Sequence, residues 1–242
     1  MAAECENWID YWNHDAFWRD SPLWEINSRI FFEKAKQVLD FRGSDCVLNI
    51  GCGSGYTEFF LAPLVQRVHA VDVADQFLDM CSERCKDYQN VTVGPLKKED
   101  YTNLEHLQGP FSVILCVSVV QYYKNVEEVE ALISSARKVA APGAKMLIAD
   151  LPLKRNSFGF LWDALCSLVL SFKGGYSLVL LKVAFKRWAQ KTSYRDFYSK
   201  TKQLYFSRRQ LETLIERMGL QAEILQEDFS VYANRLRLLI QF

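Results

Sequence analysis

Short runs of apolar residues recur along the chain and are separated by polar or amphipathic segments. Such runs, rich in Val, Ile and Leu and bounded by polar turns, predict strands of a sheet that is buried on both faces. Five of them occupy residues 46–50, 67–71, 91–93, 111–117 and 145–150, and two closing strands follow at 221–225 and 236–242.

The segments between these runs have the spacing of amphipathic helices. Over residues 125–143, apolar side chains keep helical spacing as far as Ala140, and Pro142-Gly143 is expected to close the helix. Over residues 206–220, Ser207 and Gln210 have the spacing of a capping box, and Gly219 suits the C-terminal cap. Alternating strands and helices predict an α/β fold. We expect a doubly wound, seven-stranded, mostly parallel sheet with helices on both faces and a ligand beyond the carboxyl ends of the strands.

A glycine-rich turn directly follows the first predicted strand. Gly51, Gly53 and Gly55 form a G-x-G-x-G pattern. Dinucleotide-binding folds place a third glycine where this chain has Tyr56, which disfavours a nicotinamide-dependent oxidoreductase. By itself, such a turn is also compatible with a tight strand-to-helix loop that binds nothing.

This turn resembles the first motif of the Rossmann-like (class I) S-adenosylmethionine-dependent methyltransferases. Asp72, at the end of the second strand, stands where that family carries an acidic residue for the two ribose hydroxyls. Residues 111–128 and 136–151 are similar to the family's fourth and fifth strands with their flanking segments, and residues 205–225 are similar to its late helix and sixth strand. The resemblance covers about residues 31–150 and 205–242.

The resemblance implies that S-adenosyl-L-methionine is the cofactor. It implies contacts from the following residues: Asn49, Gly51, Cys52, Gly53, Gly55, Asp72, Val73, Asp100, Val117 and Gln121. For Asp100, a charged side chain in a solvated loop is an equally good interpretation. Two positions depart from the family pattern: Asn49 stands where an acidic residue is usual, and Ser112 replaces an aspartate at the start of the fourth strand.

Methyl transfer requires in-line positioning of the acceptor, and a base only where the nucleophile must lose a proton. The candidates are Tyr122, in the loop after the fourth strand, and His14, one of three histidines. A lone histidine in an aromatic segment is more often a packing or surface residue, so both interpretations of His14 stay open.

Two segments lie outside the common sheet, so we divide the chain into four parts. Residues 1–30 form an aromatic N-terminal lid, 31–150 the cofactor-binding core, 151–204 an inserted cap, and 205–242 the last helix and closing strands. The aromatic residues of the first part are expected either to cover the cleft or to pack in the core.

Within the cap, residues 158–188 predict a hydrophobic helical hairpin with Gly174-Gly175 at its turn, where glycine tolerates positive φ. Its apolar run is broken by charges and glycines and is too short to span a bilayer. We expect the hairpin to cover the acceptor. The alternative is peripheral contact with an anionic membrane, because a basic series follows, from Lys182 to Lys200.

Composition limits which classes of acceptor are expected. Lys plus Arg and Asp plus Glu are equal at 29 each, so no overall charge favours nucleic acid. Seven irregularly spaced cysteines and no recognisable leader favour a reducing, cytoplasmic setting, and Cys81 and Cys85 lack further ligands for a metal. We therefore expect a methyltransferase acting on a small molecule with a hydrophobic or aromatic part. The alternatives are a protein, lipid or nucleic-acid acceptor, or a regulator that binds the cofactor without transferring its methyl group.

Overall fold

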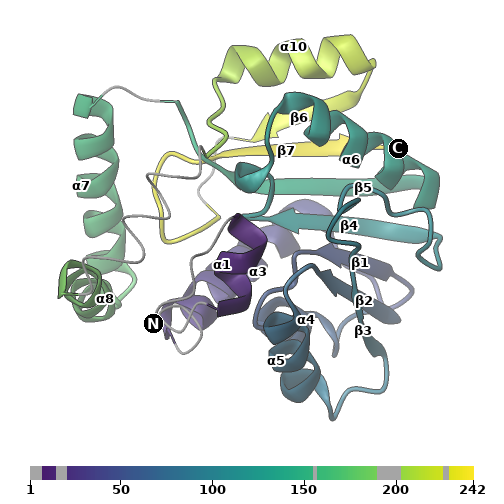
Figure 1. The fold of residues 1–242 in the computed structure, drawn as a ribbon, viewed down its shortest axis with the longest axis horizontal. Helices are drawn as coiled ribbons and strands as arrows, with labels where there is room; N and C mark the ends of the chain where they lie inside the picture. The colour runs from purple at the N-terminus through teal and green to yellow at the C-terminus, as the bar shows by residue number, and fades with distance from the viewer. Residues whose placement is uncertain (1–6, 15–20, 155–156, 190–202, 226–228) are drawn as a thin grey trace.

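A seven-stranded sheet forms the centre of the molecule (Figure 1), in a computed structural model that describes residues 7–14, 21–154, 157–189, 203–225 and 229–242. The strand order is β3-β2-β1-β4-β5-β7-β6; the first five strands are parallel and β7 is antiparallel to both neighbours. The predicted fold class is confirmed. The strands are β1 Cys46–Ile50, β2 Arg67–Asp72, β3 Val91–Pro95, β4 Phe111–Val117, β5 Ala140–Leu151, β6 Gln221–Leu225 and β7 Leu236–Gln241.

Side chains alternate between the two faces of the sheet, so each strand contributes to two hydrophobic layers. Leu48 and Ile50 of β1 belong to the same cluster as Ile114 of β4, whereas Val47 and Val113 belong to the opposite one. Because both layers are apolar, the central strands are buried on both faces, which explains their continuous hydrophobic runs.

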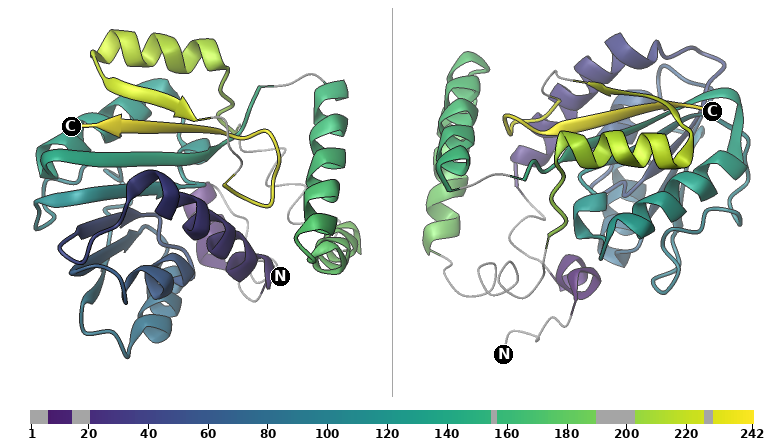
Figure 2. Two further views of the ribbon diagram at one scale, coloured as in Figure 1. Left: turned by 180° about the vertical axis from the view of Figure 1, so that it is seen from behind. Right: turned by 90° about the horizontal axis from the view of Figure 1, so that it is seen from above.

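Helices cover both faces of the sheet (Figures 1 and 2). One face carries α3 Leu23–Leu39, α4 Tyr56–Leu61 and α5 Asp75–Cys85, and the other carries α6 Val126–Val139 and α10 Arg208–Met218. A short helix, α1 Trp8–His14, lies against α5, where Asn13 accepts a hydrogen bond from the Asp75 amide at 2.8 Å. The N-terminal aromatic segment is thereby attached close to the carboxyl edge of the sheet.

The boundary between α6 and β5 differs from the prediction. Ala140 is already extended, with φ −77° and ψ 144°, and pairs with Phe111, so the helix ends at Val139. Pro142 and Gly143 therefore lie inside the irregular start of β5 and do not close the helix. The register between β4 and β5 shifts before Lys145 pairs with Val113, and this irregularity accommodates the Pro-Gly pair.

The predicted helical hairpin is present as α7 Ser157–Lys173 and α8 Ser177–Ala189. It stands beside the body of the sheet in the three views (Figures 1 and 2). Gly175 has φ +73°, as expected for the turn, but Gly174 is not in the positive-φ region; a Cβ there would lie 2.2 Å from the Tyr176 ring. In the part of the chain that is described, no helix is long and apolar enough to cross a membrane.

The capping box of α10 gives a stability test. The Ser207 hydroxyl accepts a hydrogen bond from the Gln210 amide at 3.2 Å, and the Gln210 side chain accepts one from the Ser207 amide at 2.8 Å. We expect Ser207→Ala to lower the free energy of unfolding by about 1 kcal/mol, measured by urea denaturation. Ser207→Asp keeps an acceptor and should stay near wild type; equal losses in both variants would contradict a capping role.

Candidate cofactor site

The glycine-rich turn leaves the carboxyl end of β1 and is held against the end of β2. The amides of Gly51 and Cys52 both donate to the Val71 carbonyl, at 2.8 and 3.0 Å. All three glycines of the turn have positive φ, between +54° and +80°. This conformation is strained for other residues, so the local sequence requires glycine at each position.

A side chain at each of the three glycines would contact different residues. A Cβ on Gly51 would lie 2.2 Å from the Val119 side chain, and one on Gly55 would lie 2.7 Å from the Cys81 backbone. Gly55 therefore allows α4 and α5 to pack closely, while Tyr56 beside it lies under the Arg84 guanidinium. Among the described residues, a Cβ on Gly53 would meet just the Trp24 ring, at 3.9 Å, and Gly53 lines the pocket. Its backbone is thus open to a ligand.

Asp72 links this turn to the end of β2. Its two carboxylate oxygens accept hydrogen bonds from the Gly53 and Ala74 amides, each at 3.0 Å. Burial raises the pKa of Asp72, and the backbone hydrogen bonds oppose that shift. Each oxygen keeps a lone pair for a further donor, so Asp72 can accept hydrogen bonds from a pair of ligand hydroxyls.

An aromatic pocket lies in front of this carboxylate. Trp8 stacks on Tyr122 with ring centroids 5.7 Å apart, and Trp12 meets Tyr122 edge-on at 5.7 Å. Asp72 is the only acidic or basic residue among the described residues of the lining. The lining comprises Trp8, Trp12, Trp24, Gly51, Gly53, Asp72, Val73, Phe77, Leu96, Tyr101, Val117, Ser118, Val119, Tyr122 and Tyr123.

The predicted site residues thus fall into two groups. Gly51, Gly53, Asp72, Val73, Val117 and Tyr122 line the pocket, and Gly55 supports it from behind. Cys52 is buried in a cluster with Cys81, away from the lining. The Gln121 amide donates to the Ser118 carbonyl at 3.2 Å, which steadies the loop after β4.

Two further candidates are placed less directly. Asp100 is exposed and accepts a hydrogen bond from Asn103 at 3.0 Å, while the next residue, Tyr101, reaches the pocket. The Tyr101 hydroxyl donates to Glu128 at 2.6 Å. Burial raises the pKa of the Tyr101 hydroxyl, and the neighbouring Glu128 carboxylate raises it further. His14 is the last residue of α1, and its side chain lies outside the described part of the structure. The roles of Asp100 and His14 stay predictions.

Both positions that depart from the family pattern have a carboxyl group beside them. The Asn49 amide donates to Glu58 of α4, and both side chains are buried. The Ser112 hydroxyl donates to Asp45 at 2.8 Å. Each of the two positions therefore has an acidic side chain as its hydrogen-bond partner, and the sequence pattern gave no sign of either pairing.

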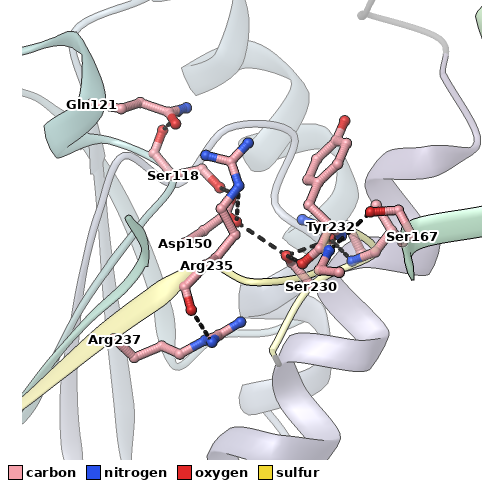
Figure 3. A network of polar contacts seen from close by, with 11 residues as sticks. Ser118, Gln121, Asp150, Ser167, Ser230, Tyr232, Arg235 and Arg237 are labelled. Carbon is pink, nitrogen blue, oxygen red and sulfur yellow. Dashed lines mark hydrogen bonds and ion pairs between the residues drawn. The ribbon is translucent and has the colours of Figure 1, made fainter. Parts of the chain in front are cut away.

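A polar network joins the pocket to the rest of the molecule (Figure 3). Asp150, at the end of β5, accepts hydrogen bonds from the hydroxyls of Ser118 and Ser230, and Arg235 lies 3.6 Å from it. Ser118 lines the pocket and has φ +59°, a strained conformation that this hydrogen bond stabilises. On the far side of the network, Ser167 of α7 accepts from the Ala233 amide at 3.0 Å.

Several lining residues were not among the predicted site residues. Trp8, Trp12 and Trp24 belong to the aromatic segment that was expected to form a lid or pack in the core, and Phe77, Leu96, Tyr101 and Ser118 were not singled out. Leu96 and Ser118 could have been found from the sequence by their position, because β3 and β4 end immediately before them and ligands bind at the carboxyl ends of such strands.

Comparisons with known proteins point to the same family as the glycine turn and Asp72. Residues 47–143 match the family model described as a methyltransferase domain. Chondramide synthase cmdD of Chondromyces crocatus is 30% identical over 126 residues, which cover 51% of this chain and 3% of that protein. Demethylmenaquinone methyltransferase of Tropheryma whipplei is 26% identical over 122 residues. The match spans about half of each chain, at 50% of this chain and 48% of the relative.

Among solved structures, the N-methyltransferase NodS of Bradyrhizobium japonicum, in complex with S-adenosyl-L-homocysteine, is similar over 96% of this chain and 95% of its own. The TM-score is 0.54 and the sequence identity 16%, so this similarity shows a shared fold.

The pair formed by Asn49 and Glu58 predicts an unusual pH dependence of stability. Within the part of the chain that the structure describes, Asn49 Oδ1 and Glu58 Oε2 are both buried without a hydrogen-bond partner. Burial raises the pKa of Glu58 from 4.5 to about 7, and the Asn49 hydrogen bond opposes that shift. The stabilising contribution of protonated Glu58 is therefore complete below pH 4.5 and lost as the pH rises through about 7.

We expect Glu58→Gln to remove this pH dependence and to be more stable than wild type above neutral pH, by about 1–3 kcal/mol. A glutamine amide can both donate to Asn49 Oδ1 and accept from its amide, which supplies the missing partner. Urea denaturation between about pH 5 and about pH 8 measures the effect. Glu33→Gln, at an exposed position of α3, is the control. A constant loss of stability at every pH in Glu58→Gln would contradict this interpretation.

Proposed function

We propose that this chain, which belongs to the class I S-adenosylmethionine-dependent methyltransferases, transfers a methyl group to a small molecule with a hydrophobic or aromatic part. The observation that carries the proposal is the position of Asp72. Its carboxylate is bonded to the Gly53 amide of the glycine turn and borders a pocket with aromatic walls.

The residues of the turn fit S-adenosyl-L-methionine. Asp72 would accept the ribose hydroxyls, and the open backbone of Gly53 would lie under the methionine part. When bound, the cofactor supplies a methyl group already activated on a sulfonium centre. The aromatic rings of the pocket would favour that positive charge, because the face of an aromatic ring attracts cations.

The remaining contribution of the chain is to position the acceptor and exclude water. Seven aromatic side chains line the pocket: Trp8, Trp12, Trp24, Phe77, Tyr101, Tyr122 and Tyr123. A flat or apolar acceptor fits such walls, and without a basic residue among the described lining residues a highly anionic acceptor has no counter-charge there. The acceptors named for the matched relatives include demethylmenaquinone, which supports but does not identify a small-molecule acceptor.

The N-terminal segment and the hairpin would close the acceptor side. Val179 and Leu180 of α8 pack in one cluster with Trp8, Trp12 and Trp24, so α8 supports the aromatic wall from outside. We propose that residues 158–188 serve as a cap in this way, and that the protein works in the cytoplasm. A regulator that binds the cofactor without transfer is the competing function, and the acceptor screen below distinguishes it.

Cofactor binding can be tested at Asp72. We expect S-adenosylmethionine and S-adenosylhomocysteine to bind and raise the melting temperature. Asp72→Ala should weaken both by about tenfold or more, because a charge-assisted hydrogen bond contributes on the order of 1.5–3 kcal/mol. Calorimetry measures the affinities, with Asp75→Ala, an exposed carboxylate on α5, as the control. Asp72→Asn keeps one acceptor oxygen and should lose less. Binding of NADH but of neither methyl-cofactor form would contradict the proposal.

The acceptor is sought by incubating the protein with labelled S-adenosylmethionine and fractionated small-molecule pools. With an acceptor in hand, we expect His14→Gln or Tyr122→Phe to lower kcat by about 10²-fold to 10⁴-fold if that side chain moves a proton, with little change in S-adenosylhomocysteine affinity. His106→Gln and Tyr205→Phe, at exposed positions, are the matched controls. Unchanged kcat in both test variants would mean that neither side chain moves a proton and that the chain catalyses the transfer by positioning alone. Cofactor binding without turnover on any pool would favour the function of a regulator.

A further inference from the structure

The outer surface of the α7–α8 hairpin is strongly apolar. Its large exposed residues include Phe172, Leu178 and Phe185, which keep 65%, 71% and 67% of their surface in solvent. Elsewhere in the described chain, the large exposed apolar side chains are Phe59, Leu64 and Tyr205. We call the following set the hairpin apolar surface: Trp162, Leu165, Val169, Phe172, Leu178, Leu181 and Phe185.

These residues have the spacing of a single stripe on each helix. On α7 they recur at intervals of three or four from Trp162 to Phe172, and on α8 they recur in the same way from Leu178 to Phe185. Residues at such intervals lie on one side of a helix. Each helix therefore turns one apolar stripe to solvent. Contiguous apolar patches of this kind mark interaction sites on soluble proteins.

The opposite side of α8 already has its partner. Val179 and Leu180 pack against the aromatic cluster that contains Trp8, Trp12 and Trp24. On α7, the Ser167 hydroxyl accepts a hydrogen bond from the Ala233 amide, and Ser171 is fully buried. The hairpin is thus attached to the body of the protein by its inner side, while the side chains of the hairpin apolar surface stay largely exposed to solvent.

The charge around the stripes identifies an occupant for this surface. Between residues 157 and 189 the sequence carries Lys173, Lys182, Lys186 and Arg187, and the sole acidic residue is Asp163. Lys173 and Lys182 are exposed and directly follow Phe172 and Leu181 of the apolar surface. The whole chain has a net charge of zero, so this basic excess is local. A second copy of the chain would bring like charges together, whereas an anionic lipid surface would neutralise them.

We propose that the hairpin apolar surface docks on an anionic membrane, with its aromatic and aliphatic side chains in the interface and its lysines at the lipid headgroups. No described helix can span the bilayer, which agrees with binding in the plane of the interface. Docking in this orientation places α8 between the lipid and the aromatic wall of the pocket. Binding does not depend on methyl transfer, so its test is independent of the proposed function.

Sedimentation with vesicles tests the proposal. The full chain is incubated with vesicles of phosphatidylcholine alone or of phosphatidylcholine with phosphatidylserine. We expect it to bind the anionic vesicles and to be released as salt is raised. The triple variant Phe172→Ser, Leu178→Ser, Phe185→Ser should bind at least about tenfold more weakly. Its matched control is Phe59→Ser with Leu64→Ser, two apolar residues, each 41% exposed, in and just after α4.

The charge is tested separately. Lys173→Glu with Lys182→Glu should weaken binding to the anionic vesicles by at least about tenfold, because each basic residue near the surface contributes about fivefold. Lys86→Glu with Lys138→Glu, just after α5 and on α6, is the control and should bind like wild type. Urea midpoints near wild type show that the variants fold.

Other outcomes would overturn the proposal. Wild-type protein that binds neither kind of vesicle has no membrane-docking surface. Equal binding by the triple variant would place the lipid contact elsewhere on the chain. A dimer that is seen without lipid in sedimentation velocity, and that dissociates in the triple variant, would assign the hairpin apolar surface to a second copy of the chain.

Discussion

The hydrogen bond from the Gly53 amide to the Asp72 carboxylate is the constraint on which the site depends. It joins the turn after β1 to the end of β2 and so fixes the glycine turn and the carboxylate relative to each other. The sheet makes this possible, because parallel pairing brings Ile50 and Val71 side by side at its carboxyl edge. A buried carboxylate with two backbone donors is already oriented before a ligand arrives, which lowers the entropic cost of binding.

Polar groups at both ends of the sheet are arranged by the same requirement for partners. Asn49 is paired with Glu58, Ser112 with Asp45, and Asp150 with Ser118 and Ser230. The pairs of Ser112 and Asp150 join segments that are distant in sequence, whereas Asn49 and Glu58 lie in the successive elements β1 and α4. An unpaired buried polar group costs more than a paired one contributes, so both positions that depart from the family pattern contribute to the structure through these hydrogen bonds.

The aromatic wall and the hairpin show the opposite situation, in which apolar residues lie outside the main core. Trp8, Trp12 and Trp24 are partly buried and border the pocket, and Val179 and Leu180 of α8 pack in the same cluster. The outer stripes of α7 and α8 are largely exposed to solvent in the described part of the chain. A chain that exposes this much apolar surface forgoes the hydrophobic stabilisation that burial would give, so the surface is understood best through an interaction beyond the folded chain.

The sequence by itself determined the order of strands and helices, the glycine turn, the capping box at Ser207 and the helical hairpin, because these depend on local periodicity and on backbone conformation. It also indicated Asp72 by its place at a strand end. Only the tertiary structure decided that Glu58 lies against Asn49, that Tyr101 and not Asp100 reaches the pocket, and which side of α8 is covered. Those outcomes depend on how separate elements pack against one another, and neither composition nor periodicity encodes which side chains this packing brings together.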